Sequence, residues 1–80
     1  MASRHSQLWR MMAAVAKGAV PFDGDRYNLV KEWAKAFLEE KGDLAIANLS
    51  GKVVLVSELA AEPEKHPDVV EVLFKLAAGG

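Results

Sequence analysis

The spacing of hydrophobic positions is clearest in the middle of the chain, over residues 27–41. Apolar side chains recur there every three or four positions, which is the period of one face of an α-helix. Asp23 or Asp25 is placed to cap the start, and Gly42 stands where a helix often ends in a left-handed residue. The pattern predicts a helix over 27–41 with an apolar stripe of Tyr27, Val30, Trp33, Ala34, Phe37 and Leu38.

Strand-like residues follow this helix. Leu44, Ile46 and the run 53–56 have the side chains that sheets prefer, and the intervening Asn-Leu-Ser-Gly at 48–51 is typical of a turn. The sequence therefore predicts a β-hairpin. Residues 58–65 are polar and interrupted by Pro63, which indicates a short helical turn and then a loop.

Two segments fit more than one element. Residues 69–78 fit a helix, in which Glu71 and Lys75 would pair four positions apart, or a strand with alternating apolar residues. Three valines within 69–72 favour the strand, because β-branched side chains lose rotamer freedom in a helix. Residues 8–17 are rich in Met and Ala, as in a helix, but the following Lys-Gly and Ala-Val-Pro-Phe suggest a turn between two strands. Composition leaves both alternatives open for 8–17.

Composition bounds the class of protein. Eighty residues make one domain, and 51% hydrophobic with 26% charged residues is a globular composition. A net charge of -1 argues against nucleic acid as a partner, since phosphate-binding proteins carry an excess of Lys and Arg. Without cysteine there are no disulfides and no thiolate chemistry. No apolar run is long enough to span a membrane, so we expect a cytoplasmic protein without membrane contact.

Few residues suggest catalysis. No serine has a partner base at a recognisable spacing, and His5 and His66 are expected to be solvent-exposed residues of a terminus and a loop. Asp23 and Asp25 are better explained as helix caps than as a carboxylate pair. We therefore expect no enzyme, no catalytic residue, no metal site and no cofactor.

The end of the chain adds a resemblance. Leu44-Ala-Ile-Ala, Gly51-Lys-Val-Val, Ser57-Glu-Leu-Ala and the final Val-Leu-Phe-Lys-Leu-Ala-Ala-Gly-Gly resemble, in that order, the C-terminal half of the ThiS/MoaD sulfur-carrier proteins. The resemblance implies an α+β fold: a small ubiquitin-like β-grasp, in which one main helix covers a mixed sheet. Residues 1–80 would form this single domain, with 1–7 as a disordered extension and 78–80 as a mobile tail.

The resemblance also implies a function. In this family an E1-like adenylating enzyme activates the terminal carboxylate, here that of Gly80, which becomes a thiocarboxylate that delivers sulfur to a sulfur-accepting synthase in cofactor biosynthesis. Gly79 would keep the approach to the reacting carbon slender, and Phe74 and Leu76 would contact the partner. Such a carrier is a protein substrate without cofactors of its own, and we expect it to be monomeric when alone.

Two alternatives compete with the carrier. The first is a small interaction or regulatory module with the order α-α-β-β-α, in which Gly79-Gly80 only ends a helix and Trp9, Met11 and Met12 are exposed to a protein partner. The second is a winged-helix-like DNA-binding domain with 27–41 as recognition helix, which the overall negative charge disfavours.

Overall fold

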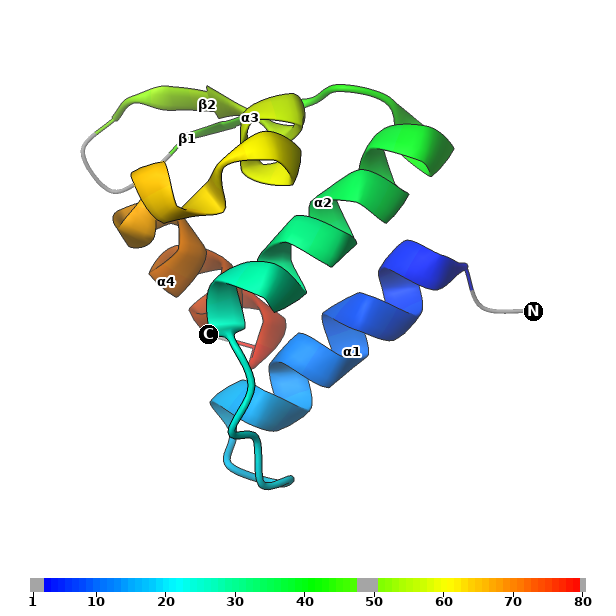
Figure 1. The fold of residues 1–80 in the computed structure, drawn as a ribbon, viewed down its shortest axis with the longest axis vertical. Helices are drawn as coiled ribbons and strands as arrows, with labels where there is room; N and C mark the ends of the chain where they lie inside the picture. Colours follow the sequence, from blue (N-terminus) through cyan, green and yellow to red (C-terminus); the bar gives the residue numbers. More distant parts are fainter. Residues whose placement is uncertain (1–2, 48–50, 80) are drawn as a thin grey trace.

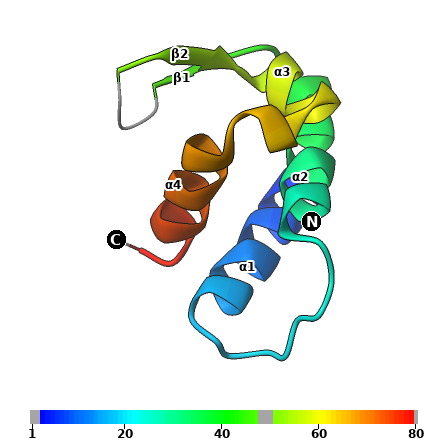
Figure 2. The same cartoon turned by 60° about the vertical axis from the view of Figure 1, so that its left-hand side comes forward.

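The computed structural model describes residues 3–47 and 51–79, and within them the chain is mainly helical (Figure 1). Helices α1 and α2 pack side by side, α4 packs against α1, and the strands β1 and β2 lie over one end of the helices (Figure 2). The elements in chain order are α1 (Arg4–Ala16), α2 (Arg26–Lys41), β1 (Ala45–Ala47), β2 (Val53–Leu55), α3 (Val56–Ala61), the 3-10 helix η1 (Pro63–Lys65) and α4 (Pro67–Ala77).

The expected β-grasp fold is wrong. Within the described residues the sheet consists of two antiparallel strands, not of a mixed sheet beneath one main helix. The observed order differs from the alternative order α-α-β-β-α by the short α3 and η1 between the hairpin and the last helix. Residues 4–7, expected in a disordered extension, form the first turn of α1.

Helix α2 is confirmed, and its ends show why it forms. The carboxylate of Asp25 accepts a hydrogen bond from the backbone N–H of Tyr27 at 2.9 Å, which satisfies one of the free donors at the helix start. Gly42 ends the helix at a φ of 91°, a conformation that glycine adopts without steric cost. Trp33 is 5% exposed and Ala34 and Val30 are fully buried, so the predicted apolar stripe faces the core.

The hairpin is also confirmed. Ala45 pairs with Leu55, Ile46 with Val54 and Ala47 with Val53. Two hydrogen bonds to a side chain also close the base of the hairpin. The carboxylate of Asp43 accepts one from the backbone N–H and one from the hydroxyl of Ser57. Residues 48–50 of the predicted turn lie outside the described residues, and Gly51, its last residue, is described with a φ of 83°. Val54 is buried and Ile46 half-buried, so one face of the hairpin covers the helices.

The strand favoured for residues 69–78 is wrong, because the segment forms α4. A strand would bury Val72 and Leu76 together with Phe74, whereas Leu76 is 54% exposed and Val72 is half-buried. Pro67 occupies the first turn, where its missing N–H costs nothing, and Glu71 pairs with Lys75 at 3.7 Å. The helix penalty of valine is a few tenths of a kcal/mol, about a fifth of what burying its side chain contributes. The buried stripe of α4 is Val69, Val70, Leu73 and Phe74.

For residues 8–17 the structure decides in favour of a helix, α1. The hydroxyl of Ser3 caps it by accepting a hydrogen bond from the backbone N–H of Ser6, and Gly18 follows its end with a φ of 71°. Met12 is fully buried, and Leu8, Trp9 and Val15 pack against the core. The core therefore combines residues from all four helices and from β2.

We expect Trp33→Ala to destabilise the domain by about 3–5 kcal/mol, because it empties the site of the largest buried side chain in α2. Urea unfolding followed by far-ultraviolet circular dichroism measures this loss. Leu76→Ala is the matched control in an exposed position of α4 and should change stability by less than about 0.5 kcal/mol. Equal effects of the two substitutions would contradict the assigned core.

Candidate functional site

A groove lies between α1 and α2, and we call it the aromatic groove. Its volume is about 430 Å³, within the size range of small-molecule sites. The helices bring together residues that lie more than twenty positions apart in the sequence. The lining residues are His5, Ser6, Trp9 and Arg10 from α1, and Trp33 and Phe37 from α2.

Aromatic rings form a continuous wall in this groove. The ring centres of Trp9 and Trp33 are 5.4 Å apart, and those of Trp33 and Phe37 are 5.3 Å apart. The His5 ring meets Phe37 edge-on at 5.2 Å. These separations are typical of favourable ring pairs. Trp33 is almost completely buried, whereas Trp9 and Phe37 remain half-buried and present apolar surface to the groove.

A hydrogen-bonded pair of His5 and Glu40 closes one end of the wall. The Nδ1 atom of His5 lies 2.7 Å from a carboxylate oxygen of Glu40, and the backbone N–H of His5 donates to the same oxygen at 3.0 Å. Because an ionised carboxylate only accepts hydrogen bonds, Nδ1 carries the proton. The hydrogen bond from the His5 side chain lowers the pKa of Glu40 below its usual 4.5. The side chain of His5 is only 16% exposed, so it is not the free terminal residue expected from the sequence.

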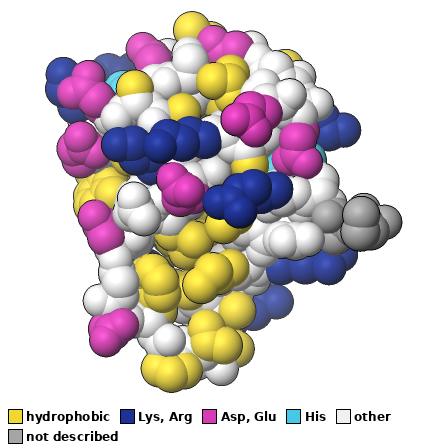
Figure 3. Space-filling view, turned by 45° about the vertical axis from the view of Figure 1, so that its right-hand side comes forward, with side chains coloured by type: hydrophobic (Ala, Val, Ile, Leu, Met, Phe, Trp, Pro, Cys, Tyr) yellow, Lys and Arg dark blue, Asp and Glu magenta, His cyan; other side chains and the backbone are white. Residues whose placement is uncertain are grey.

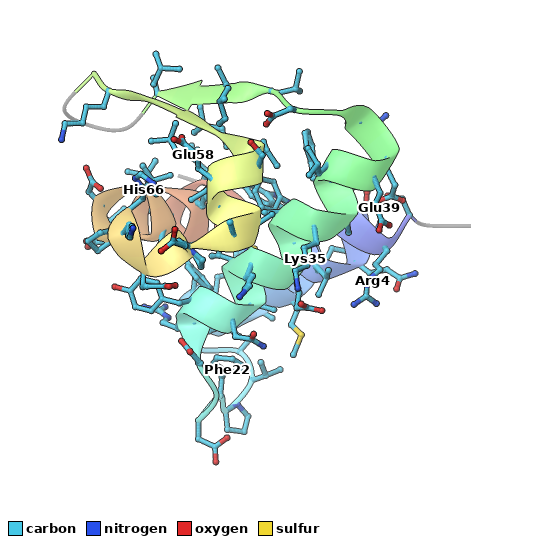
Figure 4. All side chains as sticks on the ribbon, turned by 45° about the horizontal axis from the view of Figure 1, so that its top comes forward. Arg4, Phe22, Lys35, Glu39, Glu58 and His66 are labelled. Carbon is cyan, nitrogen blue, oxygen red and sulfur yellow. The ribbon has the colours of Figure 1, made fainter. Side chains whose placement is uncertain are left out.

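The charges around the groove are unevenly compensated. Arg4 of α1 and Lys35 of α2 both approach Glu32, at 3.4 and 3.6 Å, on the side shown in Figure 4. Glu40 is occupied by His5. Arg10 is exposed and forms no hydrogen bond or ion pair with any residue that the structure describes. The aromatic groove therefore carries one uncompensated positive charge at its rim.

The hairpin is a second candidate site because one of its backbone edges is open. The backbone N–H of Val56 donates to the carbonyl of Leu44, so this pair lies in a hydrogen-bonded position of the ladder. Antiparallel ladders alternate, and the backbone groups of Ala45 and Ala47 therefore point outward, away from β2. Among the described residues, neither alanine has a partner for these outward groups.

The opposite edge is partly closed. The carboxylate of Glu58, in α3, accepts a hydrogen bond from the outward N–H of Leu55 at 2.8 Å, and Figure 4 shows Glu58 close to this end of the hairpin. β2 also contacts α3, whereas β1 contacts chiefly β2. The edge formed by Ala45 and Ala47, which we call the β1 edge, is thus the accessible one.

The outer face of the hairpin is apolar. Val53 is 66% exposed and Leu55 40%, and the side chains opposite them are Ala47 and Ala45. Native edge strands are protected by short length, charge, proline or a bulge; β1 is short, with three residues, but contains no charged residue, proline or bulge. An apolar face beside an unpaired edge is the arrangement to which extended peptides add as a further strand.

Phe74 and Leu76, which were expected to contact a sulfur-transfer partner, do not lie on one open surface. Phe74 is 3% exposed and lies beneath the guanidinium of Arg26 at 4.5 Å, so it belongs to the core and not to an open partner surface. Leu76 is exposed on the other side of α4. Gly79 is exposed with a φ of 95° just after the helix, and Gly80 lies outside the described residues.

The remaining residues that the sequence analysis considered lie in separate parts of the structure. Asp25 caps α2, and His66 precedes the first turn of α4 in a half-buried position. Of the methionines expected at a partner surface, Met11 is 45% exposed and Met12 is fully buried. Figure 3 shows apolar side chains gathered towards the end of the molecule where α1 and the following loop lie.

The comparisons with known proteins give no further guide, because no protein-family model, curated protein or solved structure matches this chain. Among the described residues, no three His, Cys, Asp or Glu side chains are grouped in a way that could hold a metal ion. No helix in the described part of the chain is long and apolar enough to cross a membrane.

We expect Glu40→Gln to reduce the melting temperature at neutral pH, with a difference from the parent that shrinks in acid. The lowered pKa of Glu40 means that its stabilisation is fully present above the unfolded-state pKa and is lost as pH falls through the folded-state pKa. Melting temperatures of both proteins at steps from about pH 7 to about pH 3 measure this. A difference independent of pH would show that the charge of Glu40 contributes nothing to the contact with His5.

Proposed function

We propose that the chain is a small protein–protein interaction module that binds an extended segment of a partner protein at the β1 edge. The observation that carries this proposal is the combination of outward backbone groups without partners at Ala45 and Ala47 and the apolar face beside them. The segment would lie antiparallel or parallel to β1 and extend the two-stranded sheet to three strands.

The side chains of the hairpin indicate the chemistry of the bound segment. Val53 and Leu55 are large and lie on β2, while the positions opposite them on β1 are alanines. The alanines leave space on the outer face, which large side chains of an added strand would fill beside β1. We therefore propose a partner segment with Val, Ile, Leu or Phe at alternate positions.

Sulfur transfer through Gly80 stays a prediction. The terminal glycines still support it. The β-grasp architecture, on which the expectation was also based, is not the fold of this chain. The interaction module depends on residues within the hairpin and needs no reactive carboxylate. It is therefore the function that the geometry supports best.

We expect Ala45→Pro to abolish strand addition without unfolding the hairpin. The N–H of Ala45 points outward and is not used in the ladder, so proline removes only a donor that a partner strand would need. The probe is a synthetic peptide with the sequence of residues 51–57. Residues 53–55 of this sequence already pair with β1 within the hairpin, at the edge of β1 opposite to the open one. Hydrogen exchange of the Ala45 and Ala47 amides should be fast in the free protein and slow with the peptide bound.

Ala45→Ser is the matched control, because it keeps the backbone N–H and a small side chain on the same face. It should bind the peptide as well as the parent, and both variants should keep the helical circular dichroism of the parent. Equal peptide binding by Ala45→Pro, or slow exchange of these two amides in the free monomeric protein, would refute the proposal.

A further inference from the structure

We infer that the aromatic groove is a binding site for a small aromatic carboxylate, whose ring lies against Trp9, Trp33 and Phe37 and whose anionic group lies at Arg10. This site is on the helical side of the molecule and is separate from the β1 edge. The inference rests on the shape of the groove, on the aromatic wall and on the position of one unpaired charge.

The wall selects a planar apolar ligand. Trp33 forms the most buried part, and the half-buried rings of Trp9 and Phe37 flank it. Ring-to-ring distances of 5.3 and 5.4 Å leave no room between these side chains for a further ring, so a ligand would pack on their exposed surface. Covering this surface removes apolar area from water and supplies the main part of the affinity.

The positive charge of Arg10 at the rim of the groove favours a ligand with a negative charge. Among the described residues Arg10 has no carboxylate partner. Glu32 is already engaged by Arg4 and Lys35, and Glu40 by His5. No acidic residue lies in α1 itself. A guanidinium at the edge of an apolar groove pairs well with a carboxylate, whose two oxygens match its planar donors.

Ser6 provides a second polar group in the groove. Its hydroxyl oxygen accepts a hydrogen bond from the hydroxyl of Ser3 at 2.8 Å, and among the described residues the proton of Ser6 has no acceptor. Ser6 and Arg10 lie four positions apart on α1, and positions with this spacing share one face of a helix. A carboxylate at Arg10 would therefore lie on the same helix face as this donor.

The two tryptophans of the chain make the site directly observable, since both line the groove. We would titrate naphthalene carboxylate into the labelled protein and follow the two indole N–H signals in proton–nitrogen spectra. Both signals should shift and saturate. The neutral amide, naphthalene carboxamide, has the same ring and should bind about twofold to fivefold more weakly, the range expected for a solvent-exposed charge pair.

Two substitutions distinguish the contribution of the ligand's charge to the affinity from that of its ring. Arg10→Gln should weaken binding of the carboxylate by about the same twofold to fivefold and leave the amide unchanged. Arg4→Gln is the matched control, because it removes another α1 guanidinium that does not line the groove, and it should leave both affinities unchanged. Added salt should weaken the binding of the carboxylate more than the binding of the amide.

The inference is overturned if the indole signals do not move, if carboxylate and amide bind equally, or if Arg10→Gln and Arg4→Gln have the same effect. Because Arg10 is exposed, its substitution leaves the core intact, and loss of binding cannot be attributed to unfolding. None of these outcomes depends on peptide binding at the β1 edge, so the two proposals are tested separately.

Discussion

Burial of one face of α4 is the constraint on which the rest of this structure depends. A chain of eighty residues without cysteine has no covalent staple, and at this length its stability margin is small. Val69, Val70, Leu73 and Phe74 contribute a third of the buried core cluster from a single helix. α1 packs against this helix, and the start of α2 is joined to it by Arg26 over the ring of Phe74. α1 also packs directly against α2 along their aromatic residues, which form the groove, and the hairpin covers the remaining end of the helices.

The elements that could be predicted from the sequence are those whose signals lie within or beside the element itself. Asp25 and Gly42 fix the ends of α2, and the residues between them repeat with the helical period. The hairpin was found for the same reason, since its strands and turn residues are adjacent in the sequence. For α4 the local signals conflicted. The valines favoured a strand by a small intrinsic preference, and the decisive term was the packing of the Val69 and Leu73 face against residues far away in the sequence.

The two candidate sites depend on tertiary contacts and were therefore missed. His5 meets Glu40 across 35 positions, and no spacing rule connects them. Trp9 was considered as an exposed residue of the alternative interaction module and Trp33 as part of the apolar stripe of a helix. Their juxtaposition follows only from the packing of α1 on α2. The hairpin itself was predicted, but which edge is open depends on Glu58, whose role in binding the Leu55 N–H becomes visible only once α3 is placed.

The most direct test of this account is the conformation of residues 67–77 in the full chain in solution. We would measure backbone Cα chemical shifts and contacts between successive amide protons over this segment. The account predicts helical shifts from Pro67 to Ala77, short distances between neighbouring amides, and contacts from the side chains of Val69 and Phe74 to the other helices. Extended-strand shifts, with amide contacts from this segment to a neighbouring strand, would contradict it.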